Sequence, residues 1–199
     1  MPLYGSPVSG NCCKVRLLLS RLGLPSERRT VDVVDRSNRP ELLDDLNPSL
    51  RVPTLVLDDG RSLGESGAIL WYFGENTELV PDDRYERAQV LQWMFFEQYD
   101  LEPAIAVVRF WVAYSGRPEE FADRLEERTR AGYRVLDALE RHLSERDWAV
   151  GSSLTLADIA LYGYTHVADE GGFDLRRFPA IGRWLDRVAS QPGHVTIDV

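Results

Sequence analysis

Residues 51–69, RVPTLVLDDGRSLGESGAI, decide the fold of this 199-residue chain. The run 52–57 is mostly apolar and partly β-branched, which predicts a buried strand. Asp59-Gly60 supplies the residues of a tight hairpin turn, and a short second strand follows it. A helix is then expected to begin near Ser66. The pattern therefore predicts a strand, a turn, a second strand and the start of a helix.

Two details of this stretch predict a seat for a small anionic peptide. Pro53 lies at the start of the strand, where a proline is tolerated. A cis peptide bond there would turn the N–H and C=O of Val52 away from the sheet, where they can pair with an extended ligand. Ser66 is a good cap residue, and the backbone N–H groups of a helix start attract a carboxylate. The alternative is an ordinary capped hairpin and helix without a ligand.

Length and composition are those of a globular protein with enough material for one large domain or two small ones. Hydrophobic residues make up 44% of the chain, and no apolar run reaches membrane-spanning length. The sequence Met1-Pro2-Leu3-Tyr4 has neither the basic nor the apolar region of a signal peptide. The two cysteines, Cys12 and Cys13, are adjacent and form no disulfide framework. A cytoplasmic protein without a membrane partner is expected.

The charge distribution argues against nucleic acid as a partner. The net charge is −9 and the isoelectric point is about 4.9, the opposite of a basic nucleic-acid-binding surface. Residues 1–78 carry nine basic and eleven acidic side chains, a net charge of −2, so residues 79–199 carry the other −7. The nearly neutral first part is the better place for an anion site.

The first 78 residues alternate strands and helices. A short strand at Leu3-Tyr4 precedes a helix over 11–22, whose apolar residues recur at i, i+3, i+4 and i+7. A strand over 29–34 and a short helix over 40–46 come before the hairpin, and a helix over 66–74 follows it. The order β-α-β-α-β-β-α predicts a thioredoxin-like α/β domain over residues 1–78.

The remainder of the chain is predicted to be helical. Residues 79–85 break the helical pattern and form the linker. Apolar periodicity predicts long helices over 87–114, with a kink or break at Pro103, and over 119–143. Thr155-Leu156-Ala157-Asp158 has the form of a capping box that starts a buried helix, and a last helix is expected over 178–189. Residues 86–199 are therefore predicted to be an all-α helical-bundle domain.

The turn from Ser6 to Lys14 is the place for chemistry. Thioredoxin-like folds present a Cys-x-x-Cys pair at this turn, where the helix dipole favours a thiolate. Here the spacing is Ser9-x-x-Cys12, which ends dithiol chemistry by the protein alone. A hydroxyl at a helix start can still hydrogen-bond to a thiolate that a ligand supplies, or it can merely cap the helix. Cys12 is expected to be buried, and Cys13 to be exposed and oxidisable.

Several motifs resemble the glutathione S-transferase family. Val52-Pro53-x-Leu55 followed by Glu65-Ser66-x-Ala68-Ile69 resembles its glutathione-binding half. The Ser9 turn is similar to that of the serine-type, theta-like members, and Ser9-Gly10-Asn11 resembles the Thr-Pro-Asn of a bacterial, nu-like group. The run 47–51 resembles the family's Asn-Pro-x-Gly-Lys, with Leu50 in place of the glycine. These motifs follow one another in the family's order over the whole chain.

The resemblance implies a set of roles, with glutathione as co-substrate and no metal. Ser9 and Asn11 would stabilise the glutathione thiolate as the catalytic pair. The glutathione-binding residues would be Arg51 for the glycyl carboxylate, Val52 and Pro53 for the peptide backbone, Glu65 for the γ-glutamyl ammonium and Ser66 for its carboxylate. The second substrate would lie against Phe110, Trp111 and Tyr114, which are equally compatible with plain core packing.

Three functions remain open on the sequence alone. The first is a glutathione transferase that conjugates glutathione to small electrophiles in detoxification. The second is a glutathione-dependent disulfide-bond reductase in which two glutathione molecules supply the sulfurs. The third is a non-catalytic, transferase-like interaction module. The resemblance also implies a homodimer.

Overall fold

The chain forms two compact units in a computed structural model that describes residues 1–116 and 118–198. The first unit comprises Met1–Thr77 together with Gln191–Val199, and the second comprises Glu78–Ser190. The last nine residues, which the sequence pattern placed in the helical domain, thus belong to the first unit. Among the described residues, no helix is both long and apolar enough to span a membrane.

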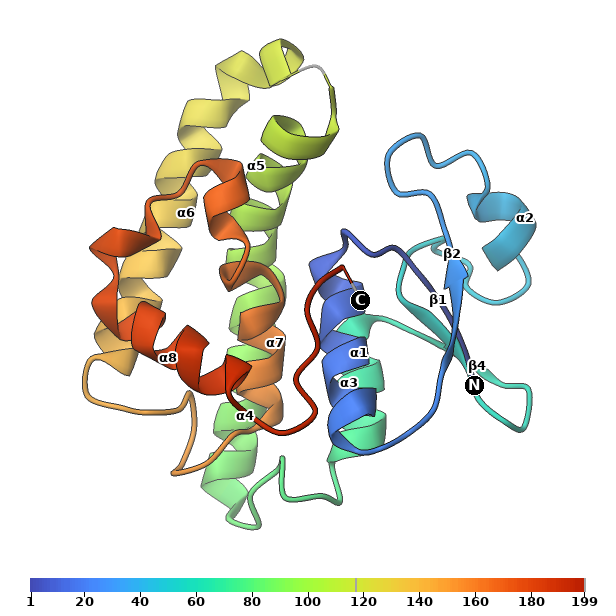
Figure 1. Cartoon of the computed structure of the whole chain (residues 1–199), viewed down its shortest axis with the longest axis horizontal. Helices are drawn as coiled ribbons and strands as arrows, with labels where there is room; N and C mark the ends of the chain where they lie inside the picture. Colours follow the sequence, from blue (N-terminus) through green and yellow to red (C-terminus); the bar gives the residue numbers. More distant parts are fainter. Residues whose placement is uncertain (117, 199) are drawn as a thin grey trace. The chain divides into compact units, whose positions relative to one another are not determined.

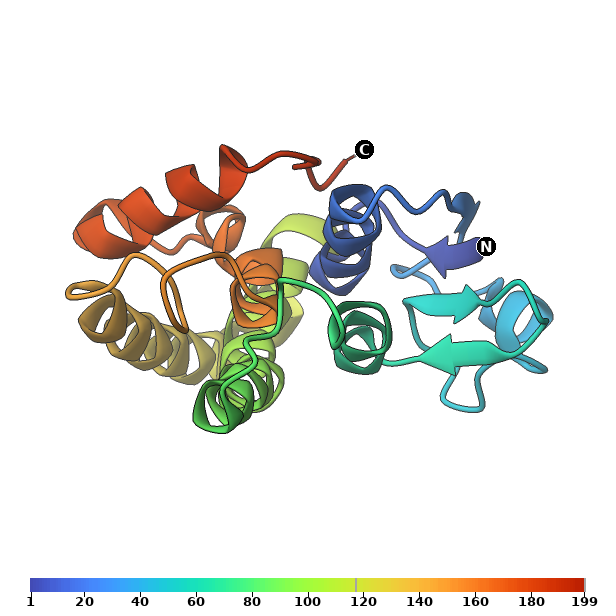
Figure 2. The same cartoon turned by 90° about the horizontal axis from the view of Figure 1, so that it is seen from below.

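The first unit is built on a four-stranded sheet in the order β2-β1-β3-β4. β1 and β2 are parallel, whereas β1 with β3 and β3 with β4 are antiparallel. The strands are β1 (Pro2–Gly5), β2 (Glu27–Thr30), β3 (Thr54–Val56) and β4 (Ser62–Gly64). Helices α1 (Gly10–Arg21) and α3 (Ser66–Gly74) lie side by side on one face, and α2 (Arg39–Leu43) lies on the other (Figure 2). This arrangement confirms the thioredoxin-like domain.

The core of this unit lies between the sheet and the helices α1 and α3. It consists of five buried side chains from β1, α1, β3 and α3: Leu3, Val15, Leu19, Leu55 and Ile69. Their positions follow from the two periodicities of the sequence, since alternate strand residues and every third or fourth helix residue point toward the same layer. Packing in this core therefore fixes the positions of the first turns of α1 and α3 relative to the sheet.

The second strand is shorter and earlier than the pattern predicted. β2 covers Glu27–Thr30, not residues 29–34, and it pairs residue by residue with the four residues of β1. A parallel strand can extend only as far as its partner, and β1 ends at Gly5, whose carbonyl still accepts the N–H of Val31. The alternation of apolar residues beyond this point is therefore not used by the sheet.

The C-terminal segment, residues 191–198, packs along α1 (Figure 1). Arg21 donates to the carbonyl of Pro192 at 3.3 Å, and Arg16 donates to the carbonyl of Ile197. Gly193 has φ = +77°, and a Cβ atom there would lie 2.9 Å from the Cα of Arg21. Only glycine meets both conditions, so the close approach of the segment to α1 depends on it.

The second unit is all-helical, as the sequence predicted. Its first long helix runs without interruption through α4 (Arg84–Phe96), η1 (Glu97–Ala106), α5 (Val107–Arg109) and η2 (Phe110–Tyr114). The remaining helices are η3 (Pro118–Phe121), α6 (Ala122–Leu143), α7 (Leu156–Thr165), η4 (Ala168–Gly171), η5 (Leu175–Arg177) and α8 (Pro179–Ala189).

Pro103 does not break the first long helix. It lies inside η1, a π-helical segment of ten residues. A proline lacks the N–H of the helical ladder, and its ring crowds the carbonyl of the preceding turn. The wider π-helical turns accommodate it, and the helix continues to Tyr114. Around Pro103 the helix is therefore π-helical and does not break.

Asp158 is the polar centre of the second unit. It has no exposed surface, and its carboxylate accepts the backbone N–H of Ala149 at 2.8 Å and the indole N–H of Trp184 at 2.9 Å. It also accepts the N–H and the hydroxyl of Thr155, both at 2.9 Å. The capping box predicted for Thr155 and Asp158 is confirmed. One carboxylate thus joins the start of α7 to α8 and to the preceding loop.

Candidate active site

Ser9 caps α1 with an acceptor position of its hydroxyl, so the hydroxyl can still act as a donor. Its backbone is extended, with φ −85° and ψ 120°, and its Oγ accepts the N–H of Cys12 at 3.3 Å. Its own carbonyl accepts the N–H of Cys13 at 2.9 Å, the first bond of the helix. A hydroxyl has one donor and two acceptor positions. The cap uses an acceptor position of the half-buried Ser9, so capping and donation to a ligand are compatible.

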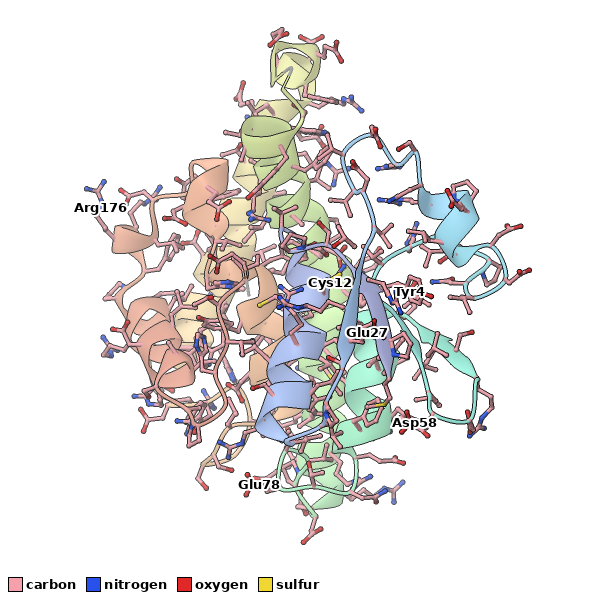
Figure 3. All side chains as sticks on the ribbon, turned by 45° about the vertical axis from the view of Figure 1, so that its right-hand side comes forward. Tyr4, Cys12, Glu27, Asp58, Glu78 and Arg176 are labelled. Carbon is pink, nitrogen blue, oxygen red and sulfur yellow. The ribbon has the colours of Figure 1, made fainter. Side chains whose placement is uncertain are left out.

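Cys12 is a packing residue, as predicted. It has no exposed surface, and a Cβ atom added to Gly5 would lie 2.8 Å from its Sγ, so the thiol fills the space beneath the end of β1. Figure 3 labels Cys12 on α1 and Tyr4 on the neighbouring strand. Burial raises the pKa of the Cys12 thiol, an effect that the Ser9 hydrogen bond only partly opposes. The thiol is therefore held in its neutral, unreactive form.

The prediction that Cys13 is exposed is wrong. Its side chain has no exposed surface, because α1 is buried on almost all sides over its first ten residues. Adjacent residues on a helix point about 100° apart, so an exposed Cys13 next to a buried Cys12 required a helix with one solvated face. The structure instead buries both thiols.

We expect neither cysteine to react with Ellman's reagent in the native protein, because both thiols are fully buried. Two thiols per chain should react after denaturation. Absorbance of the released thionitrobenzoate, recorded with and without denaturant, measures both values. Fast reaction of one thiol in the native state would show that Cys13 is accessible.

A hydrogen bond joins the first turn of α1 to the first turn of α3. The Oδ1 of Asn11 accepts the hydroxyl of Ser66 at 3.2 Å, across 55 residues of sequence. The same oxygen accepts the ammonium of Lys14 at 2.7 Å. The structure thereby brings together the Ser9 turn and the Ser66 helix start, which sequence analysis named separately. With the hydroxyl of Ser66 donating to Asn11, the first-turn N–H groups of α3 are left as the carboxylate donors of that helix.

Glu65 has an unusual backbone conformation directly before α3. Its φ is +62° and its ψ is 118°, a region that residues other than glycine rarely adopt. The side chain is exposed and makes no capping bond to the helix, while the following Ser66 is only 3% exposed. Strained backbone of this kind concentrates at ligand sites. Glu65 presents a carboxylate beside the N–H groups of a helix start.

The peptide bond between Val52 and Pro53 is cis. β3 begins only at Thr54, so the backbone of Val52 lies outside the ladder that β3 forms with β1 and β4. Val52 is half-buried and Pro53 is buried. Pairing of the Val52 backbone with an extended ligand stays a prediction.

The loop before Val52 is held by the side chain of Asn47. Its Nδ2 donates to the carbonyl of Arg51 at 3.2 Å and to the Oγ1 of Thr54 at 2.9 Å. Leu50 has φ = +52°, so it adopts the left-handed conformation for which the family's run carries glycine. The side chain of Arg51 is exposed, which is compatible with a role as the partner of a ligand carboxylate.

The three aromatic candidates for the second-substrate pocket make contacts inside the helical unit. Trp111 is 8% exposed and stacks on Phe121, with ring centres 4.8 Å apart. The hydroxyl of Tyr114 donates to Glu170 at 2.8 Å and accepts from Arg109 at 2.9 Å. Phe110 is half-buried at the start of η2. Their role in substrate binding stays a prediction.

Lys14 is the residue of this site to which sequence analysis gave no role. Its ammonium contacts Asn11 within the first turns of α1, and its side chain is 1% exposed. The composition of the sequence does single out Lys14, because it is the only lysine among 23 lysine and arginine residues. Among the residues that the structure describes, no group of three histidine, cysteine, aspartate or glutamate side chains could hold a metal ion.

Comparison with known proteins decides the family. The model for "Glutathione S-transferase, N-terminal domain" matches residues 3–81, and the one for "Glutathione S-transferase, C-terminal domain" matches residues 104–192. The chain belongs to the glutathione S-transferase family. This agrees with the order of motifs in the sequence and with the two units of the fold.

Three relatives illustrate what this family member is similar to. A glutathione S-transferase structure from Pseudomonas fluorescens Pf-5 is 46% identical, with a TM-score of 0.94 and 98% of each chain covered. The disulfide-bond oxidoreductase YfcG of Escherichia coli K12 is 31% identical over 96% of this chain and 90% of its own length. A second Pseudomonas fluorescens Pf-5 family member, solved with two bound glutathione molecules, is 27% identical, with a TM-score of 0.82 and coverage of 97% and 89%.

Proposed function

We propose that this protein binds glutathione and activates its thiol for attack on a small electrophilic substrate. The observation that carries the proposal is the hydrogen bond between Asn11 and Ser66. It places a helix start that can stabilise a thiolate, capped by Ser9, next to a helix start that can hold a carboxylate. Glutathione carries both groups on one extended backbone, for which Val52 offers a partner outside the sheet.

The free energy needed to lower the pKa of the glutathione thiol is of a size that the Ser9 turn can supply. A thiol with an ordinary pKa of about 8.5 is mostly protonated at pH 7. Lowering that pKa by about two units takes roughly 2.7 kcal/mol of preferential stabilisation of the thiolate. One hydrogen bond to a charged group contributes about 1.5–3 kcal/mol, and a helix N-terminus adds about 0.3–1 kcal/mol. The Ser9 hydroxyl, assisted by Asn11 or a backbone N–H of α1, is of the required strength.

The other roles follow the geometry of the tripeptide. Glu65 would bind the γ-glutamyl ammonium. The first-turn N–H groups of Ser66 and its neighbours would bind the adjacent carboxylate, and Arg51 would bind the glycyl carboxylate. The structure of a relative with bound glutathione supports glutathione as the ligand. Conjugation in detoxification and a cytoplasmic location stay predictions.

Replacing Glu65 by alanine should weaken glutathione binding about tenfold, with a smaller effect on turnover at saturation. The reason is that Glu65 would contact the ammonium of the ligand, not its sulfur, so it would affect ground and transition states alike. Titration calorimetry measures the affinity, and Glu75→Ala, at the other end of α3, is the control. An unchanged glutathione affinity in Glu65→Ala would show that Glu65 does not bind the ligand.

A glutathione-dependent disulfide reductase is the second candidate. It is favoured by the likeness to the disulfide-bond oxidoreductase of Escherichia coli, and by the relative solved with two glutathione molecules. In that reaction one glutathione thiolate attacks a disulfide substrate, which forms a mixed disulfide and releases one substrate thiolate. A second glutathione thiolate then attacks the mixed disulfide, which forms oxidised glutathione and releases the other substrate thiolate. Parallel assays with an aryl halide electrophile and with hydroxyethyl disulfide, each with glutathione, separate the two functions.

The third alternative, a non-catalytic interaction module, is tested by binding. A protein with the proposed site should be retained on immobilised glutathione and eluted by free glutathione. Passage without retention, together with no activity in either assay, would favour the module.

We further propose a homodimer, on the resemblance to the family. The helical unit carries an open groove of about 390 Å³ between η1 and α6, lined among others by Phe96, Tyr99, Pro103 and Val135. Tyr99 and Phe95 are 82% and 68% exposed in the single chain. Size-exclusion chromatography with light scattering should give twice the chain mass of 22.6 kDa. A mass of one chain at micromolar concentration would overturn the dimer.

A further inference from the structure

Arg16 connects two segments that lie far apart in the sequence. Its guanidinium donates to the carbonyls of Ser6 and Pro7, each at 3.4 Å, and to the carbonyl of Ile197. Ser6 and Pro7 belong to the turn between β1 and α1, and Ile197 belongs to the C-terminal segment, residues 191–198. Arginine suits this position, because its planar guanidinium carries five N–H donors in a fixed arrangement.

The Ser6 carbonyl that Arg16 contacts also holds the backbone of Ser9. The N–H of Ser9 donates to that carbonyl at 3.2 Å, which closes a turn of four residues. The N–H of Ser6 in turn donates to the Sγ of Cys12 at 3.4 Å. The position of the Ser6 carbonyl therefore helps to set the position of Ser9, whose hydroxyl caps α1.

The burial of Arg16 makes these contacts consequential. Its side chain is 9% exposed, so its charge is largely removed from water. A buried charge is costly unless hydrogen bonds compensate it, and the carbonyls of the turn and of the C-terminal segment supply such bonds. A displacement of the C-terminal segment would take one of these acceptors away. The guanidinium would then shift, and with it the turn that it contacts.

Gly193 determines how closely the C-terminal segment approaches α1. An alanine there would place its Cβ atom 2.9 Å from the Cα of Arg21, at a φ of +77°. Backbone atoms cannot remain at that distance from a Cβ atom, so the segment would have to move away from α1. Gly193→Ala therefore disturbs the docking of the segment without changing the side chain of Arg16.

We propose that Arg16 and the C-terminal segment, residues 191–198, position Ser9 for activation of the glutathione thiol. Arg16 is a positioning residue: it acts through the carbonyl of Ser6 and does not touch the substrate. Misplacing a reacting group by about 1 Å can cost about 100-fold in rate, so a small displacement of the Ser9 hydroxyl gives a measurable loss. This inference rests on the proposed function, since it takes Ser9 as the group that stabilises the thiolate.

A double-mutant cycle tests whether Arg16 and the C-terminal segment act together. In whichever glutathione-dependent assay the parent is active, Arg16→Met should lower kcat about tenfold and Gly193→Ala about fivefold. The glutathione Kd should stay within threefold of the parent in both variants. The double variant should lie within twofold of Arg16→Met, because both changes interrupt the same connection.

Each variant has a matched control that is expected within twofold of the parent. Arg29→Met removes an exposed positive charge from β2. Gly60→Ala places a Cβ atom at a φ of +87°, where no other atom lies within 4 Å. The first control accounts for the loss of a charge, and the second for a side chain in the left-handed region.

Arg16→Lys separates the bridging contacts from the charge. Lysine keeps the positive charge but has a compact ammonium in place of the planar guanidinium. If contact with both segments is what positions Ser9, Arg16→Lys should stay at least threefold below the parent in kcat. A full rate in Arg16→Lys would mean that the charge suffices, and it would overturn the bridging role.

Hydrogen exchange measured by NMR tests the connection without any activity. The Ser9 N–H should exchange at least threefold faster in Arg16→Met and in Gly193→Ala than in the parent, because its acceptor is the Ser6 carbonyl. The N–H of Ile69, a core residue of α3, is the internal reference and should keep its parent rate. A general loss of stability would accelerate the exchange of both amides.

The outcomes separate this inference from the proposed function. Additive losses in the double variant, a Gly193→Ala rate equal to that of the parent, or a Ser9 amide that exchanges no faster than the Ile69 reference predicts would overturn the positioning role. A parent that neither binds glutathione nor turns over either substrate would overturn the proposed function. The exchange rates would then still decide whether Arg16 and the C-terminal segment hold the Ser9 turn.

Discussion

Replacing Ser9 by alanine is expected to lower kcat by roughly 10- to 150-fold and to leave the glutathione Kd within about threefold. The hydroxyl caps α1 with a lone pair and can donate its proton to the ligand sulfur. A hydrogen bond to a thiolate is worth about 1.5–3 kcal/mol, which corresponds to that range of rates. The neutral thiol gains little from the same bond, so binding should be nearly unaffected.

The pKa of the bound thiol gives a second measurement of the same effect. Ultraviolet absorbance of the glutathione thiolate, followed against pH in parent and variant, should show the pKa of the bound thiol raised by about one to two units in Ser9→Ala. Ser20→Ala, exposed near the other end of α1, is the matched control and should behave as the parent. A Ser9→Ala rate within twofold of the parent would mean that another group activates the thiol.

Asp158→Ala should destabilise the protein by about 4 kcal/mol. The carboxylate is fully buried and accepts four hydrogen bonds, from Ala149, Trp184 and twice from Thr155. Its removal leaves buried donors without an acceptor, each of which costs about 1–3 kcal/mol, and removes the capping box of α7. Urea unfolding followed by circular dichroism and tryptophan fluorescence measures the loss.

A matched control distinguishes burial from the loss of a charge. Asp174 bonds to the side chain of Arg176 on an exposed surface, so Asp174→Ala should leave the urea midpoint close to that of the parent. Asp158→Asn keeps an acceptor oxygen but turns an NH₂ group toward buried donors, and it should lie between the parent and Asp158→Ala. An Asp158→Ala midpoint equal to that of the parent would refute a central role for this carboxylate.

The features that could be predicted from the sequence depend on neighbouring residues. The hairpin around Gly60, the Ser9 cap of α1 and the Thr155–Asp158 box are all set within a few residues, and the structure shows each of them. The family resemblance rests on such local motifs, which is why the two-domain fold and glutathione as ligand could be expected before any coordinates.

The features that could not be predicted depend on distant parts of the chain. The bond between Asn11 and Ser66 spans 55 residues, and no local sequence pattern around either residue predicts the other as its partner. The burial of Cys13 and the length of β2 are set by what packs or pairs with them, not by their own sequences.

The return of residues 191–198 to α1 has a consequence for how the first unit folds. Arg16 and Arg21 have carbonyl partners in this segment, 181 and 171 residues further along the chain. The thioredoxin-like unit therefore completes these contacts only after residues 191–198 have been made, although almost all of its residues come earlier. A fragment that stops at Thr77 would lack these contacts.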